Sequence, residues 1–146
     1  MPDDPYVIDA CVFSKLYLKE EGSEKCKSFF LHVVENEIPL IVPSLIVYEL
    51  LNVARRCDVP ISTPLSFLRE LSMYNLDVIE PEYDHFEKAI EISAHGNKKA
   101  GYPQFYDAIY HAIAICEEGI FITSDEKYLS KTKKYDHAVL LKDWKP

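Results

Sequence analysis

Four acidic residues stand within or directly after apolar segments of the chain. They are Asp9 in YVIDA, Glu49 in IVYELLN, Asp107 in FYDAIYHAIA and Asp125 in IFITSD. Two of them follow short strand-like runs, and the other two lie in helical, mostly apolar stretches. Burying a charge is costly unless something compensates it. Carboxylates attached to core-forming segments therefore indicate a site for a divalent cation.

The chemistry of such a site follows from its ligands. Mg²⁺ and Mn²⁺ prefer hard oxygen donors and bind through a few carboxylates while keeping several waters. Carboxylates packed together without a cation raise one another's pKa values. One or two bound ions would let the four side chains hold a phosphodiester, activate a water and stabilise the leaving oxygen. The set predicts a metal-dependent phosphodiester hydrolase.

Each of these residues also has an ordinary structural explanation. Asp9 and Asp125 would serve as turn or helix-cap residues after a strand. Glu49 would fit a solvent-facing stripe, and Asp107 would interact favourably with the N-terminal end of a helix dipole. The metal-site hypothesis depends on the combination of the four.

The pattern of apolar residues predicts alternating strands and helices. Strands are expected at 6–9, 40–42, 76–80, 119–123 and 137–141, and helices at 11–19, 23–37, 44–56, 63–73, 86–95, 104–118 and 125–132. Ser44 and Thr63-Pro64 are the expected helix starts. Asp84 and Glu87 suggest a capping box, the segment 96–103 a loop, and Gly119 a helix C-terminus.

Strands separated by helical crossovers predict a parallel sheet covered by helices on both faces. The expected fold is therefore α/β, a three-layer α/β/α sandwich around a mostly parallel five-stranded sheet, formed by residues 1–146 as a single domain. Ligands of such open sheets bind beyond the carboxyl ends of the strands. Asp9 and Asp125 occupy such positions.

Composition narrows the classes of function. The 146 residues are 48% hydrophobic and carry a net charge of −8, which argues against broad electrostatic capture of nucleic acid. No apolar run approaches the roughly 20 residues of a membrane span, and the N-terminal residues do not resemble a secretory signal. We therefore expect a cytoplasmic protein. The four cysteines are widely spaced and are expected to be free, mostly buried thiols.

The order VIDA, YELLNV, YDAIYHAIA, FITSDEKYL resembles the PIN domain family, the ribonuclease fold of VapC-type toxins. The resemblance implies a metal-dependent endoribonuclease that acts on RNA, forms a homodimer and is inhibited by an antitoxin protein. Asp9, Glu49, Asp107 and Asp125 match the acidic quartet of the family, and Thr123 matches a hydroxyl residue that helps to orient water or metal ligands. Cys11 stands where the family often has Ser or Asn.

Further residues are candidates for supporting roles. Ser124 and Asn52 would assist the acidic residues, and His111 shares a helix face with Asp107. The most plausible contacts to RNA phosphates are two basic pairs, Arg55-Arg56 and Lys98-Lys99.

Two other functions fit parts of the pattern. A PIN-fold module that binds protein or RNA with weak or no turnover is suggested by Cys11, because a thiol is a poor partner for hard metals. A phosphoryl-transfer enzyme with Asp9 as nucleophile would normally have a second aspartate at position 11. A phospho-acceptor domain using Lys142 would need an acidic pair after the first strand, which the sequence lacks.

Overall fold

The computed structural model describes residues 4–96, 98–99 and 101–146. Its centre is a five-stranded sheet in the order β3-β2-β1-β4-β5, with every neighbouring pair parallel. The strands are β1 (Tyr6–Ile8), β2 (Leu40–Pro43), β3 (Leu76–Ile79), β4 (Ile120–Thr123) and β5 (Ala138–Leu140). All five predicted strands are confirmed, and the parallel prediction holds throughout the sheet.

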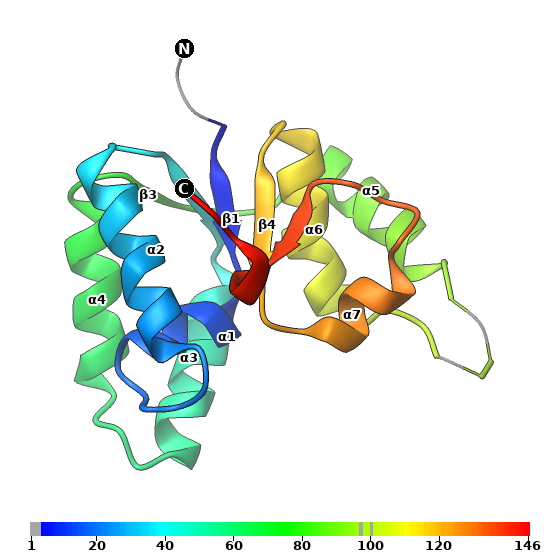
Figure 1. The fold of residues 1–146 in the computed structure, drawn as a ribbon. Coiled ribbons are helices and arrows are strands. Elements are labelled where there is room, and N and C mark those ends of the chain that lie inside the picture. Colours follow the sequence, from blue (N-terminus) through cyan, green and yellow to red (C-terminus); the bar gives the residue numbers. More distant parts are fainter. Residues whose placement is uncertain (1–3, 97, 100) are drawn as a thin grey trace.

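The helices cover both faces of this sheet. They are α1 (Ala10–Phe13), η1 (Ser14–Leu16), α2 (Ser23–Glu35), α3 (Leu45–Arg56), α4 (Ser62–Ser72), α5 (Tyr83–Ser93), α6 (Phe105–Cys116), α7 (Glu126–Lys131) and η2 (Leu141–Asp143). In Figure 1, α2 and α4 lie on one side of the strands and α5 and α6 on the other. The predicted α/β/α sandwich is therefore confirmed.

Aromatic contacts attach the two helical layers to the strands. On one face, the rings of Tyr6 and Phe29 lie 5.2 Å apart, which joins β1 to α2. On the other, the ring of Phe121 in β4 stacks on Tyr110 of α6 at 6.0 Å. Parallel strands buried on both faces are expected to be continuously apolar, and this holds for Val7 and Ile8, which are fully buried.

Two predicted helix starts are wrong in detail. Helix α4 begins at Ser62 with Ile61 as its N-cap residue, so Thr63 lies inside the first turn and does not cap it. Helix α5 begins at Tyr83, earlier than predicted, and the Asp84–Glu87 box does not form. Instead the backbone N–H of the N-cap residue Glu82 donates to Nδ1 of His85 at 2.9 Å.

The C-terminus of α6 also differs from the prediction. Glu118, with φ of 55°, takes the left-handed position that was expected for Gly119. The N–H groups of Glu118 and Gly119 bond the carbonyls of Ile115 and Ala114, the pattern of a Schellman motif. Gly119 serves another purpose, because a Cβ there would lie 2.3 Å from the carbonyl oxygen of Pro5.

The direction in which the chain adds strands to the sheet reverses between β1 and β4. From β1 the chain continues to β2 on one side, and from β4 it continues to β5 on the other. The two strands pair in register, with Ile8 opposite Ile122, and the N–H of Asp9 donates to the carbonyl of Ile122 at 3.0 Å. Open α/β sheets bind ligands at such a switch point, so the fold directs attention to the carboxyl ends of β1 and β4.

The predicted loop 96–103 contains positions 97 and 100, which lie outside the described residues. Lys98 and Lys99 are exposed within a turn. Among the helices that the structure describes, none is both long and apolar enough to cross a membrane.

Candidate functional site

A cleft of about 490 Å³ opens at the carboxyl ends of β1 and β4. All four acidic residues singled out in the sequence line it, each supplied by a different segment: Asp9 after β1, Glu49 from α3, Asp107 from α6 and Asp125 after β4. Its remaining lining residues are Ala10, Cys11, Asn52, Val53, Arg56 and Ser124. Segments more than 100 positions apart in the sequence thus contribute to one concentration of carboxylates.

A single hydroxyl group connects the carboxylate of Asp9 to the backbone of Asp125. Thr123 Oγ1 donates to Asp9 Oδ2 at 2.7 Å and accepts from the backbone N–H of Asp125 at 3.1 Å. Thr123 is fully buried at the end of β4, so its position is set by the sheet. Asp125 also caps α7, because its Oδ1 accepts from the N–H of Tyr128 at 3.0 Å. One oxygen of Asp9 and one of Asp125 are therefore held in place by neutral donors.

Glu49 is positioned by a residue that the sequence did not identify. The Tyr110 hydroxyl donates to Glu49 Oε1 at 2.6 Å, and its ring is fully buried in α6. A buried tyrosine normally finds a partner for its hydroxyl group, and Tyr110 lies one helical turn after Asp107. The position of Tyr110 relative to Asp107 was visible in the sequence. The identity of the partner of its hydroxyl group was not, because Glu49 belongs to another helix, α3.

Burial and mutual repulsion both disfavour the ionised carboxylates at this site. Burial is the main cause that raises the pKa of Asp107 to about 7, and the charges of Asp9, Asp125 and Glu49 raise it further. Burial also raises the pKa of Asp9 and that of Glu49, although hydrogen bonds from Thr123 and Tyr110, respectively, oppose the change. Carboxylates whose pKa values rise in this way are poorly compensated by the protein itself. The arrangement suits a cation that would replace the protons.

Three of the predicted supporting residues lie at the cleft. Cys11, Asn52 and Ser124 line the cleft, and Cys11 Sγ lies 3.9 Å from Thr123 Oγ1. Burial raises the pKa of the Cys11 thiol, so that it remains protonated beside Asp9. A neutral thiol is a poor ligand for a hard metal ion.

The structure places one of the four predicted RNA contacts at the cleft. Arg56 lines the cleft, whereas Arg55, Lys98 and Lys99 are not among its lining residues. Lys131 of α7 also acts on the site, because its charge lowers the pKa of Asp107. Of the two basic pairs predicted from the sequence, only Arg56 therefore lies at the cleft.

His111 has a structural role. Its Nδ1 lies 2.9 Å from the hydroxyl of Tyr128 and its Nε2 lies 2.7 Å from the carbonyl oxygen of Asp136. Since the carbonyl can only accept, Nε2 carries the proton and Nδ1 accepts from Tyr128. Burial lowers the pKa of His111, which favours this neutral form. The side chain joins α6 to α7 and does not line the cleft.

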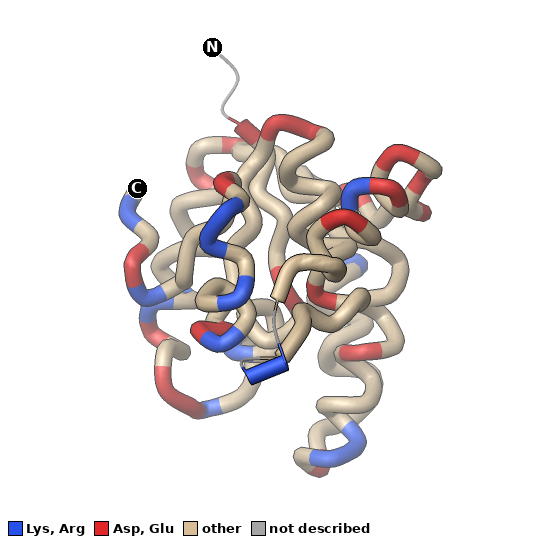
Figure 2. Tube along the Cα trace, turned by 90° about the vertical axis from the view of Figure 1, so that its right-hand side faces the viewer, with Lys and Arg blue, Asp and Glu red and all other residues tan. Residues whose placement is uncertain are grey.

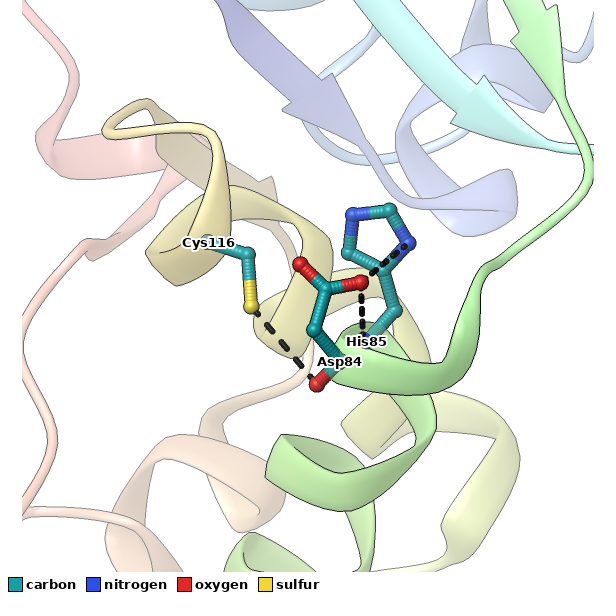
Figure 3. Close-up of side chains that lie close together, drawn as sticks. All are labelled: Asp84, His85 and Cys116. Atoms are coloured by element: carbon teal, nitrogen blue, oxygen red, sulfur yellow. Dashed lines mark hydrogen bonds and ion pairs between the residues drawn. The ribbon is translucent and has the colours of Figure 1, made fainter.

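A second group of metal-ligand types lies elsewhere. Asp84, His85 and Cys116 place one ligand atom each within 4.8 Å of one another, where the start of α5 meets the end of α6 (Figure 3). Both imidazole nitrogens of His85 already have partners, since Nδ1 accepts from the N–H of Glu82 and Nε2 lies 2.9 Å from Glu117 Oε1. We interpret this group as a helix-capping network. The four cysteines are free, as expected, but the expectation that most are buried is wrong: Cys26 is buried, Cys11 and Cys116 are partly buried and Cys57 is exposed.

Comparisons with known proteins agree with this geometry. The family model described as PIN domain matches residues 6–135. No curated protein matches the sequence.

Solved structures with the same fold have low sequence identity. VapBC2 from Rickettsia felis, bound to a DNA fragment from their promoter, has a TM-score of 0.66 and 15% identity over 93% of this chain and 96% of the other. PAE2754 from Pyrobaculum aerophilum has a TM-score of 0.61 and 19% identity, and the match covers 97% of this chain and 92% of the other. A toxin–antitoxin complex from Klebsiella pneumoniae has a TM-score of 0.63 and 16% identity, and the match covers 93% of this chain and 97% of the other.

Proposed function

This chain belongs to the PIN domain family, and we propose that it is a metal-dependent endoribonuclease that hydrolyses RNA phosphodiester bonds. The observation that carries the proposal is the convergence of Asp9, Glu49, Asp107 and Asp125 on one cleft. Members of this family are typically nucleases. We also propose that residues 1–146 form one domain, because Trp144 near the C-terminus packs on Phe29 at 5.0 Å.

The residues present fit a hard divalent cation. The four acidic side chains offer only oxygen donors, and Thr123 and Tyr110 each engage a single oxygen of Asp9 and of Glu49, respectively. We propose that Asp9, Asp107 and Asp125 hold one or two Mg²⁺ or Mn²⁺ ions, with Glu49 as a further ligand or as the group that orients water. Such ions would supply Lewis acidity and help to generate the nucleophile at neutral pH.

The protein's own groups would then have distinct tasks. Thr123 fixes the orientation of Asp9 relative to the backbone of Asp125. Tyr110 fixes Glu49, whose pKa is raised by burial, so that this carboxylate holds a proton more readily than an exposed glutamate does. Arg56 lines the same cleft and offers a positive charge to an incoming phosphate.

We further propose that the protein is the toxin of a type II toxin–antitoxin pair and acts in the cytoplasm. Two of the structurally similar proteins are described as VapBC2 and as a toxin–antitoxin complex, which supports an antitoxin protein as a partner. A homodimer is supported by an apolar groove lined by the exposed rings of Tyr48, Phe86, Phe105 and Tyr106. Exposed apolar surfaces of this kind mark sites of protein association.

One observation favours a second candidate function. Cys11 occupies a cleft position where a hydroxyl or amide would serve a metal better. A PIN-fold module that binds protein or RNA without turnover would tolerate this thiol. The conservative variant Cys11→Ser is a direct test, because it should increase cleavage in a weak nuclease and leave a module without turnover inactive.

The test of the main proposal is incubation of the purified protein with structured RNAs and either Mn²⁺ or Mg²⁺. We expect cleavage that stops when a chelator is added and is lost in Asp9→Asn. Cleavage that survives the chelator and the substitution undiminished would reject the site.

Tyr110→Phe tests the contact to Glu49. Loss of the hydroxyl leaves the Glu49 carboxylate without its donor, and disturbing such outer partners of metal ligands costs about 10–100-fold in activity or metal affinity. We expect a decrease of this size in the rate of RNA cleavage.

The matched control is Tyr128→Phe, which removes another buried tyrosine hydroxyl, the donor to His111. That change should lower the free energy of unfolding by about 1 kcal/mol with a smaller effect on cleavage. Equal rates for the parent and Tyr110→Phe would show that the Glu49 contact has no part in the reaction.

A further inference from the structure

A second groove, of about 680 Å³, continues from the acidic cleft. Ser124 and Asp125 line both, so the two are joined at the carboxyl end of β4. Four lysines line this groove: Lys15, Lys25, Lys127 and Lys142. An adjoining hollow of about 620 Å³, which shares Lys15 and Lys25, adds Lys19 and Lys27. A path bordered by lysines therefore leads away from the carboxylates.

Segments that are distant in the sequence assemble this path. Lys15 belongs to η1, Lys25 to the first turn of α2, Lys127 to α7 and Lys142 to η2. Figure 1 shows three segments near the end of the sheet where β1 and β4 finish: helix α7, the short helix η2 and the loop that precedes α2. No basic run in the sequence marks these positions, so the prediction of RNA contacts from adjacent basic pairs overlooked them.

The path contrasts with the charge of the whole chain. The net charge is −8, and Figure 2 shows basic segments interspersed with acidic ones on the face in view. Six of the 16 lysines and arginines nevertheless border the two hollows, beside five acidic residues, so this region carries a small positive excess. Such a protein needs a local site to hold a polyanion, because its overall field repels one.

Ion pairs engage some of these lysines but not all. Lys15 Nζ lies 3.0 Å from Glu20 Oε1, and Lys142 pairs with Glu126 across the groove. In the part of the chain that the structure describes, Lys25 and Lys127 form no ion pair with a carboxylate. Lys25 instead lies 5.7 Å from the ring centroid of Trp144. Their charges remain available to a ligand.

We propose that one strand of RNA runs from the acidic cleft across Ser124 and Asp125 into this groove, with its phosphates bound by Lys25, Lys127 and Lys142. This inference rests on the proposed ribonuclease function. Lysine binds phosphate as a point charge, and among the residues that the structure describes no aromatic ring lines the 680 Å³ groove to stack on a base. The groove thus holds the backbone of the strand without reading its sequence.

The test measures binding separately from cleavage. A fluorescein-labelled single-stranded RNA is titrated with the full-length Asp107→Asn protein over a range of salt concentrations, and its fluorescence anisotropy gives the Kd. The variants Lys25→Gln and Lys127→Gln/Lys142→Gln are made in that background. Each lysine that contacts a phosphate should reduce the slope of log Kd against log salt by about 0.7.

Two further variants make the result specific. Lys88→Gln removes a lysine of α5 that lies outside both hollows and outside the acidic cleft, and it should leave the Kd and the slope unchanged. Glu126→Gln removes a negative charge from the groove and releases Lys142, so it should tighten RNA binding.

The inference would be overturned if the lysine variants bound RNA with the same Kd and the same salt dependence as the Asp107→Asn protein. Lysine-dependent binding of poly-L-glutamate without lysine-dependent binding of RNA would also overturn it, because the groove would then recognise an acidic protein. The proposed function fails independently, if the unsubstituted protein does not cleave RNA with Mn²⁺ or Mg²⁺.

Discussion

Replacing Asp107 with asparagine is expected to abolish RNA cleavage and, at the same time, to stabilise the metal-free protein above pH 7. The two effects have a common cause. Asp107 is partly buried beside other carboxylates, so its ionised form is disfavoured in the folded protein until a cation compensates the charge. Even outer-sphere changes at metal sites cost about 10–100-fold, and loss of a proposed ligand should lower the cleavage rate by more than about 100-fold.

The sign of the stability effect follows from the pKa of Asp107. Its value of about 7 in the folded protein is above the ordinary value of 3.8, so the folded state holds the proton more tightly than the unfolded state. The free energy of unfolding therefore falls as the pH rises from about 4 to about 7, and the loss is complete above pH 7. Asp107→Asn removes this loss.

Because the Asp107 carboxylate is only half-buried, solvent screens much of this effect. We expect the variant to gain about 1–2 kcal/mol over the parent at pH 8 and almost nothing at pH 4. Urea unfolding in the presence of a chelator, at several pH values, measures the difference. Asp77→Asn is the matched control, because Asp77 is exposed on the edge strand β3. Equal gains in both variants would contradict the repulsion that we infer at the cleft.

Divalent cations are expected to raise the thermal stability of the parent protein strongly, and to do so only when the carboxylates can ionise. Ligand present at about 100 times its Kd stabilises a folded protein by about 2.7 kcal/mol. Binding must displace the proton that Asp107 holds below pH 7. The increase in Tm caused by Mn²⁺ or Mg²⁺ should therefore be small at pH 5.5 and large at pH 8.

Two variants distinguish the sites at which the ion would bind. Asp107→Asn should lose most of the metal-dependent increase in Tm. Cys116→Ala, which removes the thiol from the Asp84–His85–Cys116 group, should retain it. The reverse result, with the increase lost in Cys116→Ala and kept in Asp107→Asn, would relocate the metal to the junction of α5 and α6.

Much of the fold was already evident in the sequence because its signals are local. Short apolar runs predicted each of the five strands to within one residue at either end. Alternation with helices predicted a parallel sheet, and from that the meeting of Asp9 and Asp125 at one edge. Helix ends were less predictable, since capping depends on which nearby side chain reaches a free N–H, as His85 does for Glu82.

The residues that surround the carboxylates were decided by the tertiary structure. Helix α6 is buried on nearly every side, so its pattern does not show that Tyr110 faces Glu49 or that His111 faces Tyr128. The lysines of the second groove are likewise separated by up to 127 positions, from Lys15 to Lys142. Periodicity determines which residues share a strand or a helix face. Contacts between elements depend on how whole layers pack, and that information is spread over the entire core.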